Sequence, residues 1–178
     1  MNGNTPYAPD DARGAALVTP KRSDLGTPTG ADIDRAALTA ELLTIVTAVW
    51  FDIDHGSGAG VSAFFTPDAE LCFGARCFYG TAEIDGVYAA RDARGPRVSR
   101  HLVTNLHLTA TGATHATAVS NLLLFAQDGQ PPRTALTPAL VGDVRDEFEL
   151  HHDTWLIRSR HISAVFAPPG LDLAVPSH

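Results

Sequence analysis

Cysteine is scarce in this chain, whose 178 residues include only Cys72 and Cys77. The two are five positions apart and belong to no CxxC pair, which excludes a disulfide-rich scaffold and a cysteine zinc cluster. No His/His/carboxylate set has the local spacing of a metal site, so no metal is expected. We therefore expect two free thiols in a protein of the reducing cytoplasm.

Basic charge and long apolar runs are also lacking. The net charge is −7 and no block of Lys and Arg occurs, which argues against nucleic acid as a partner. No uninterrupted apolar run approaches the roughly 20 residues that span a bilayer, and residues 1–30 lack the basic-then-apolar layout of a secretory signal. The sequence predicts a soluble protein with no membrane partner.

A single folded domain is predicted between two irregular ends. Residues 1–31 are rich in Pro, Gly, Thr, Asp and Ala and are expected to be disordered or loosely docked, and residues 167–178 form a tail. Within the domain, residues 32–166, a helix is predicted from Arg35 to about Asp54. Its apolar positions recur at helical spacing and form one broad face: Leu38, Leu42, Ile45, Val46, Val49, Trp50 and Ile53.

The order of the remaining predicted elements defines an α+β fold. A short helix is expected at 61–65, a β-hairpin at 69–74 and 76–80, and a third helix at 82–91. Four strands follow at 97–110, 115–126, 137–150 and 154–166. Helices followed by a long antiparallel meander favour a strongly bent sheet wrapped around the long helix, with a pocket between them.

The strand that begins at Arg97 supplies the candidate chemistry. Alternation places His101, Val103 and Asn105 on one face, which we expect to line the pocket. The alternative is a packed histidine whose nitrogens are satisfied by the backbone. On the long helix, Asp52 and Asp54 are about 200° apart, so only one of them can face the pocket.

Five stretches in this order resemble the SnoaL-like branch of the nuclear transport factor two superfamily, a cone-shaped α+β barrel. They are Trp50-Phe-Asp-Ile-Asp with Ala63-Phe-Phe-Thr-Pro-Asp-Ala, Gly80-Thr-Ala-Glu-Ile, Arg100-His-Leu-Val-Thr-Asn, Val141-Gly-Asp-Val-Arg-Asp-Glu-Phe, and Trp155-Leu-Ile-Arg-Ser-Arg. The resemblance covers residues 36–166. It implies three helices packed in a curved, mostly antiparallel mixed sheet, a homodimer and, for the enzymes of the family, no cofactor.

Among those enzymes, the ones similar to scytalone dehydratase, bile-acid dehydratase and ketosteroid isomerase are dehydratases, cyclases and isomerases. By position, the resemblance implies His101 as the general acid–base. It implies Asp54, or Asp52 in a slightly different register, as the carboxylate, and Asn121 as a contact for a substrate carbonyl. An imidazole with a pKa near 6.5 can take up and return a proton at neutral pH, and a carboxylate on its far nitrogen fixes the tautomer.

Further side chains could contact a ring-containing, oxygenated small molecule. Tyr79 and Tyr88 offer phenol donors, Asn105 an amide and Trp50 a stacking surface, although ordinary packing is the simpler role for these aromatic residues. Arg145 and Asp146 match the Arg/Asp pair of epoxide hydrolases, but adjacent strand residues point to opposite faces. The alternative function is a non-catalytic binding or assembly module that resembles the small subunit of ring-hydroxylating dioxygenases.

Overall fold

The computed structural model describes residues 30–134 and 137–169. The chain divides into two units, residues 1–35 and 36–178, and the second carries the fold. The predicted N-terminal extension lies almost wholly outside the described residues, as do the last residues of the tail.

The first helix, α1 (Gly30–Gly56), begins a few residues before the predicted start. Its predicted apolar face is confirmed: Leu42, Val46 and Val49 are fully buried and Trp50 nearly so. By length and mean hydropathy, residues 34–56 could also cross a membrane. This segment was not found as an uninterrupted apolar run in the sequence, because polar residues interrupt it. Because its apolar face packs into the core of the domain, α1 is the core helix of this fold.

The predicted element order is confirmed. After α1 come the 3₁₀ helix η2 (Val61–Phe64), strands β1 (Phe65–Phe73) and β2 (Arg76–Tyr79), and helix α2 (Gly80–Asp92). Strands β3 (Arg97–Thr111), β4 (His115–Asp128), β5 (Leu140–His151) and β6 (Thr154–Phe166) complete the chain. The second predicted helix is thus only one 3₁₀ segment, and β1 begins before the turn expected at 66–68, in a stretch where its pairing with β6 shifts register.

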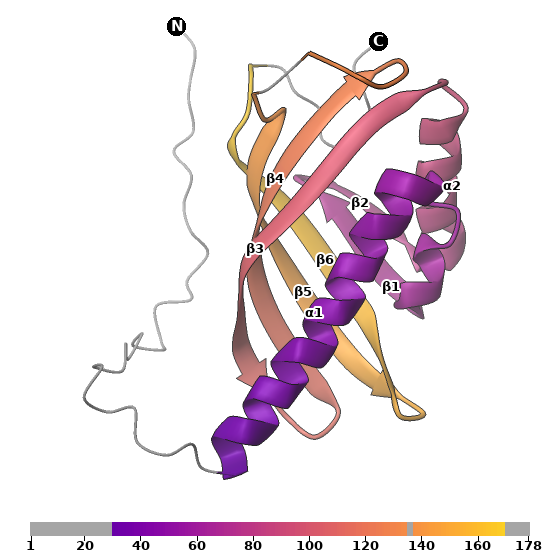
Figure 1. The fold of residues 1–178 in the computed structure, drawn as a ribbon. Helices are drawn as coiled ribbons and strands as arrows, with labels where there is room; N and C mark the ends of the chain where they lie inside the picture. The colour runs from indigo at the N-terminus through magenta and orange to yellow at the C-terminus, as the bar shows by residue number, and fades with distance from the viewer. Residues whose placement is uncertain (1–29, 135–136, 170–178) are drawn as a thin grey trace, which may run out of the picture. The chain divides into compact units, whose positions relative to one another are not determined.

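The six strands form one curved mixed sheet in the order β2-β1-β6-β5-β4-β3. Only β1 and β6 pair in parallel, so the predicted mostly antiparallel sheet is confirmed. In Figure 1, α1 runs diagonally across one face of the sheet and α2 lies on the side of β1 and β2. Strand β3 is an edge strand, which leaves its outer backbone groups open to contacts from α1.

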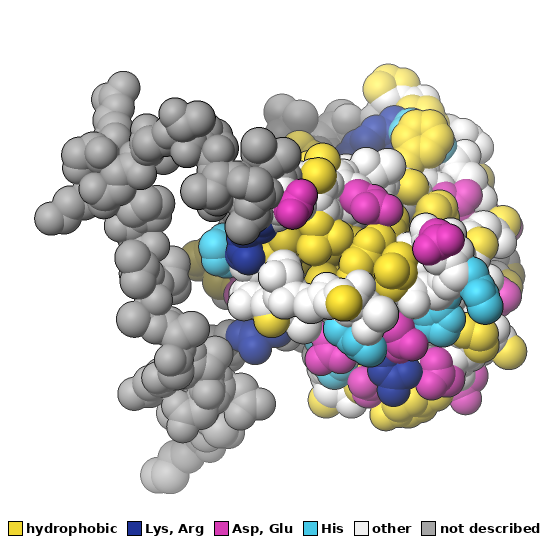
Figure 2. All heavy atoms as spheres, turned by 90° about the horizontal axis from the view of Figure 1, so that it is seen from below, with side chains coloured by type: hydrophobic (Ala, Val, Ile, Leu, Met, Phe, Trp, Pro, Cys, Tyr) yellow, Lys and Arg dark blue, Asp and Glu magenta, His cyan; other side chains and the backbone are white. Residues whose placement is uncertain are grey.

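Alternate residues of β4, β5 and β6 point into the core between the sheet and α1. On β4 these are Ala116, Ala118, Ser120 and Leu122; on β5, Val144, Asp146 and Phe148. Seen from below in Figure 2, hydrophobic side chains gather in the middle of the surface, and acidic and histidine side chains lie around them. Hydrophobic side chains are thus exposed in the middle of this surface, among polar groups.

The cysteine prediction is wrong, because Cys72 and Cys77 form a disulfide and neither is free. The predicted hairpin explains the bond: in the β1–β2 pair the two residues are directly opposite, with their Cα atoms 4.0 Å apart. Cross-strand pairs without backbone hydrogen bonds have such short Cα separations. A spacing of five residues indicates a disulfide only once the strand register is known.

Candidate active site

The side chains of His101 and Asp54 meet between β3 and α1. Nδ1 of His101 is 2.7 Å from Oδ1 of Asp54, and the two side chains are only 11% and 7% exposed. Asp54 lies in the last turns of α1, and His101 follows the first residues of β3. The structure thus brings together the two residues that were predicted to form an acid–base pair.

Asp54 accepts three hydrogen bonds. Its Oδ1 takes the Ser99 hydroxyl at 2.7 Å as well as the His101 ring, and its Oδ2 takes the backbone N–H of His101 at 2.8 Å. Burial acts to raise the pKa of Asp54. The hydrogen bond and charge of His101, its backbone N–H and the Ser99 hydroxyl together lower this pKa by more than burial raises it, so it lies below 3.8. An ionised Asp54 only accepts, so Nδ1 of His101 carries the proton.

The other ring nitrogen of His101 is therefore the basic one. Among the residues that the structure describes, none donates or accepts a hydrogen bond at Nε2. A neutral imidazole with its proton on Nδ1 has its lone pair on Nε2 and can take a proton from a bound molecule. The arrangement is that of a general base held by a carboxylate.

Trp50 fixes the plane of the imidazole. Its ring stacks on that of His101 with centroids 4.4 Å apart and planes 12° from parallel. The Arg160 guanidinium lies 5.0 Å from the centroid of the Trp50 ring, and Arg160 forms a buried two-point ion pair with Asp146 at 2.7 and 2.9 Å. His101 of β3, Trp50 of α1, Arg160 of β6 and Asp146 of β5 thus contact one another in series, which leaves His101 little freedom to turn.

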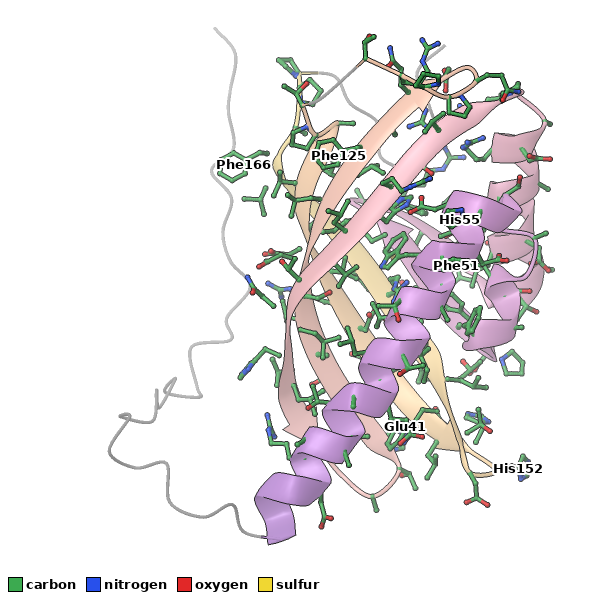
Figure 3. The ribbon with its side chains drawn as sticks, in the orientation of Figure 1. Glu41, Phe51, His55, Phe125, His152 and Phe166 are labelled. Atoms are coloured by element: carbon green, nitrogen blue, oxygen red, sulfur yellow. A yellow bond between two sulfur atoms is a disulfide. The ribbon has the colours of Figure 1, made fainter. Side chains whose placement is uncertain are left out.

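A pocket of about 180 Å³ opens beside this pair. Its lining residues come from α1 and β3: Thr47, Trp50, Phe51, Asp54, His55, His101 and Val103. Phe51 is 66% exposed, and its ring contacts that of His55 on the upper part of α1 (Figure 3). Sites for drug-sized ligands usually measure about 300–1,000 Å³, so a ligand of that size would extend outward along Phe51.

Asp52 and Asp54 diverge as the helix geometry required. Oδ2 of Asp52 accepts the backbone N–H of Gly60 at 3.0 Å, so Asp52 holds the glycine-rich loop after α1 rather than the histidine. Of the two registers left open by the sequence, the structure therefore places Asp54 beside His101.

The shared face expected for His101, Val103 and Asn105 does not extend to Asn105. The β3–β4 register shifts after Thr104, and Asn105 adopts a left-handed backbone with φ +55°. This bulge turns Leu106 and Leu108 toward the core and leaves Asn105 exposed.

Asn121 is also outside the pocket. It lies opposite Thr104 on the outer face of β4, where its amide accepts from Asn105 at 3.0 Å and donates to Asp143 at 3.0 Å. The neighbouring residues of β4, Ser120 and Leu122, are those that point into the core. The structure therefore does not bring Asn105 and Asn121 to His101.

Neither of the two candidate tyrosines lines the pocket. Tyr79 is exposed, and the charge of Glu70, then its hydrogen bond, raises the pKa of the Tyr79 phenol. Tyr88 is buried against Gly58, whose φ of +78° and 2.7 Å clearance for an added Cβ admit only glycine. Burial raises the pKa of Tyr88 to about 12. Trp50 is the one proposed contact residue that lines the pocket.

The sequence did not identify Ser99 or Arg160, and so it missed the partner of Asp146, which is Arg160. Ser99 is two residues before His101 on the same face of β3, so alternation could have included it. Asp146 pairs with Arg160 rather than with Arg145, which is exposed. Arg160 could have been found by its alternation with the buried Ile162, but its partner required the β5–β6 register.

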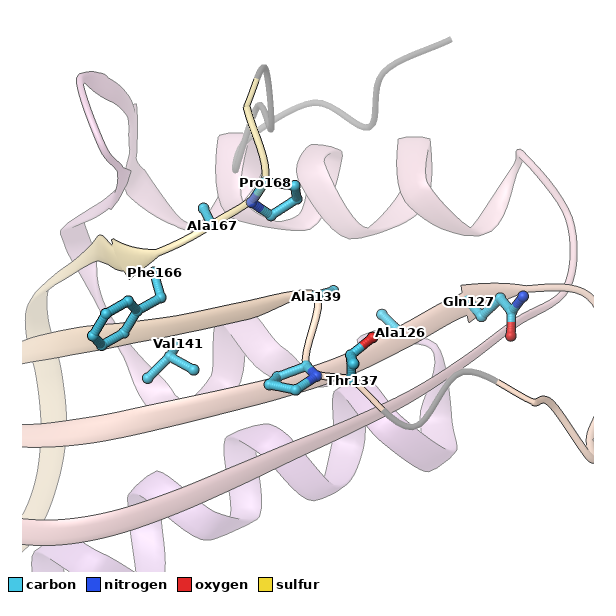
Figure 4. A pocket seen from close by; sticks show the side chains of 9 residues that line it. Ala126, Gln127, Thr137, Ala139, Val141, Phe166, Ala167 and Pro168 are labelled. Atoms are coloured by element: carbon cyan, nitrogen blue, oxygen red, sulfur yellow. The ribbon is translucent and has the colours of Figure 1, made fainter. Parts of the chain in front are cut away.

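A larger cavity of about 630 Å³ lies elsewhere, near the start of β5 and the end of β6 (Figure 4). Its lining residues are Ala126, Gln127, Thr137, Pro138, Ala139, Val141, Phe166, Ala167 and Pro168. These include no carboxylate, imidazole or thiol, so the described lining of this cavity offers no acid–base group.

Comparison with known proteins agrees with this architecture. The family model described as "SnoaL-like domain" matches residues 34–161. No curated protein matches the chain. Solved structures match well: ActVI-ORFA from Streptomyces coelicolor is 25% identical over 72% of this chain and 98% of its own, with a TM-score of 0.61.

Two further structures share the fold. A candidate scytalone dehydratase from Novosphingobium aromaticivorans DSM 12444 is 14% identical over 80% of this chain and 99% of its own, with a TM-score of 0.65. A protein from Catenulispora acidiphila, solved in complex with S-DNPA, is 23% identical over 71% and 94%, with a TM-score of 0.61. These likenesses extend over nearly the whole described domain.

Proposed function

Because this chain belongs to the SnoaL-like domain family, we propose that it is a cofactor-independent enzyme that moves protons on a small molecule. The observation that carries the proposal is the 2.7 Å contact between Asp54 and His101 at the pocket. The reaction class is a dehydration, cyclisation or isomerisation, and the substrate is an oxygenated molecule with a ring.

His101 is the general acid–base in this mechanism. Its Nε2 removes a proton from a carbon next to a carbonyl, and the imidazolium that forms keeps its Nδ1–H bond to the Asp54 carboxylate. The Nε2–H, which can exchange with solvent, then gives a proton to a leaving hydroxyl, which departs as water, or to another carbon, which completes an isomerisation. Asp54 stays ionised throughout, since its pKa is held below 3.8.

Trp50 contributes in two ways. Its stacked ring holds the imidazole in plane and lies over it as the positive charge develops. Its Nε1–H is buried and has no hydrogen-bond partner among the described residues. A buried donor without a partner is costly, so a ligand oxygen or a water that accepts from it would be stabilised.

The test is proton exchange in D₂O with a panel of cyclic hydroxy ketones. Deuterium gained at the carbon next to the carbonyl, or loss of water, is followed by mass spectrometry. The wild type should catalyse exchange of at least one compound, and His101→Ala should lower that rate by about 10²–10⁴-fold. His107→Ala is the matched control, because His107 is exposed on the other side of the β3 bulge. Equal rates for the wild type and His101→Ala would remove His101 from the mechanism.

The second candidate is a non-catalytic ligand-binding module. The observation that favours it is the apolar packing next to the pocket: Val103, which lines the pocket, and Leu124 pack against the hydrophobic core, to which Leu122 belongs. A compound that raises the melting temperature of both the wild type and His101→Ala, with no exchange by either, would establish this function instead.

A further inference from the structure

Four side chains of types that can ligate a metal lie together on the outer face of the sheet, away from His101. Cys72 on β1 lies opposite Cys77 on β2 and beside His161 on β6, so the three form one row across the strands. Glu70 precedes Cys72 by two residues and shares its face. Leu71, between them, points into the core.

The spacing of these groups suits a tetrahedral ion. Nε2 of His161 is 3.2 Å from Oε2 of Glu70, and Sγ of Cys72 is 3.3 Å from Oε1 of Glu70. One ligand atom each from Glu70, Cys72 and His161 lies within 4.8 Å of the other two. Zinc bonds of about 2.0–2.3 Å place neighbouring ligand atoms about 3.3–3.8 Å apart, so Glu70, Cys72 and His161 need to move little. The sulfur of Cys77, which is bonded to that of Cys72, must move away from it once the bond is broken.

We propose that this cluster is a zinc site controlled by the Cys72–Cys77 disulfide. While the disulfide is intact, its sulfurs carry no thiolate charge and the remaining donors are Glu70 and His161. Two electrons and two protons from a dithiol break the S–S bond, and the dithiol becomes a cyclic disulfide. The two cysteines then lose their thiol protons to solvent as they bind Zn²⁺ together with His161 and Glu70.

The surroundings allow an ion to enter and hold its ligands in place. The side chains of His161 and Glu70 are 43% and 32% exposed, so the site faces solvent on their side, whereas Cys72 is buried. Tyr79 hydrogen-bonds to Glu70 and so restrains the carboxylate. Partners of this kind orient ligating carboxylates in known metal sites.

The experiment compares the oxidised and the reduced full-length protein. The protein is reduced with a phosphine, freed of reductant without oxygen, and titrated with Zn²⁺ against a chromophoric chelator. The reduced protein should bind one equivalent, and the oxidised protein should bind at least tenfold more weakly. Co²⁺ in place of Zn²⁺ should give the intense visible bands of a tetrahedral thiolate site only after reduction.

Variants separate this site from unspecific binding. His161→Ala should weaken zinc binding by reduced protein at least tenfold, whereas the exposed His107→Ala should leave it unchanged. Circular dichroism checks that each variant is folded. Equal zinc affinity for the oxidised and reduced protein, or for His161→Ala and the wild type, would overturn the proposal. The absence of thiolate–cobalt bands in the reduced wild type would do so without any variant.

Discussion

Replacing Asp54 with asparagine should reverse the tautomer of His101. The backbone N–H of His101 can only donate, and it points at Oδ2 of Asp54. In Asp54→Asn the amide oxygen must occupy that position, which places the NH₂ group where Oδ1 meets Ser99 and Nδ1 of His101. Nδ1 must then accept, so the ring proton moves to Nε2 and the base at the pocket is lost.

The size of the effect follows from the bonds that change. Three charge-assisted hydrogen bonds, worth about 1.5–3 kcal/mol each, become neutral ones worth about 0.5–1.5 kcal/mol. The amide costs less to bury than the carboxylate, so we expect a net destabilisation of about 1–3 kcal/mol at pH 7. Proton-transfer activity should fall by about 10²–10⁴-fold.

The same prediction has a defined pH dependence. The pKa of Asp54 is lowered from 3.8, so its stabilising contribution is fully present above pH 3.8 and is lost as pH falls through the lower pKa of the folded state. The difference in unfolding free energy between the wild type and Asp54→Asn should therefore shrink below pH 3.8. Urea denaturation at a series of pH values measures it.

The tautomer itself can be measured without a substrate. ¹⁵N chemical shifts of imidazole nitrogens distinguish a protonated from a bare ring nitrogen, and His101→Gln assigns the signal among the eight histidines. Asp52→Asn is the matched control, because Asp52 bonds to Gly60 and not to the ring. The reasoning is refuted if Asp54→Asn retains the proton on Nδ1, or if Asp52→Asn moves it.

Three other results are expected. Asp146→Ala should lower the free energy of unfolding, measured by urea denaturation, by about 3–5 kcal/mol, because it leaves the buried Arg160 charge unpaired. The double variant Asp146→Leu with Arg160→Met should recover most of this loss. A loss below about 1 kcal/mol for Asp146→Ala would contradict the prediction. Because burial raises the pKa of Tyr88 from 10.0 to about 12, stability should be full below pH 10 and fall by about 3 kcal/mol as pH rises through 12, a loss that Tyr88→Phe should lack. The homodimer implied by the resemblance remains a prediction, and sedimentation of a monomer would count against it.

Most of the fold could be predicted because its signals are local. The face of α1 shows in apolar residues at helical spacing, and the strands show in alternation and turn residues. The strand boundaries at β3 and β6 follow the sequence closely for this reason. The start of β1 was missed because Pro67 in a strand reads as a turn, and only the parallel contact with β6 shows otherwise.

The site was predictable only up to the first irregularity of its strand. His101 and Val103 lie before the bulge and face the pocket as alternation predicts. Asn105 occupies the bulge itself, and one extra residue moves the side chains that follow, up to the next register shift after Leu108, to the other face. Nothing in the local pattern of β3 marks that residue, because asparagine tolerates a left-handed backbone but does not require it.

Asp54 also has a structural task that explains why acid–base geometry and stability depend on the same carboxylate. Strand β3 is the edge of the sheet, and the backbone N–H of His101 points away from β4 toward α1. An unpaired edge N–H must be satisfied or covered, and Oδ2 of Asp54 satisfies it while Oδ1 holds the ring. The bond to the backbone fixes the carboxylate, and the fixed carboxylate in turn fixes the imidazole. In the Asp54→Asn background, a second substitution that brings a hydrogen-bond acceptor to Nδ1–H should therefore restore the tautomer of His101, but not the charge-assisted bond to its backbone N–H. Such a variant should regain activity without regaining stability.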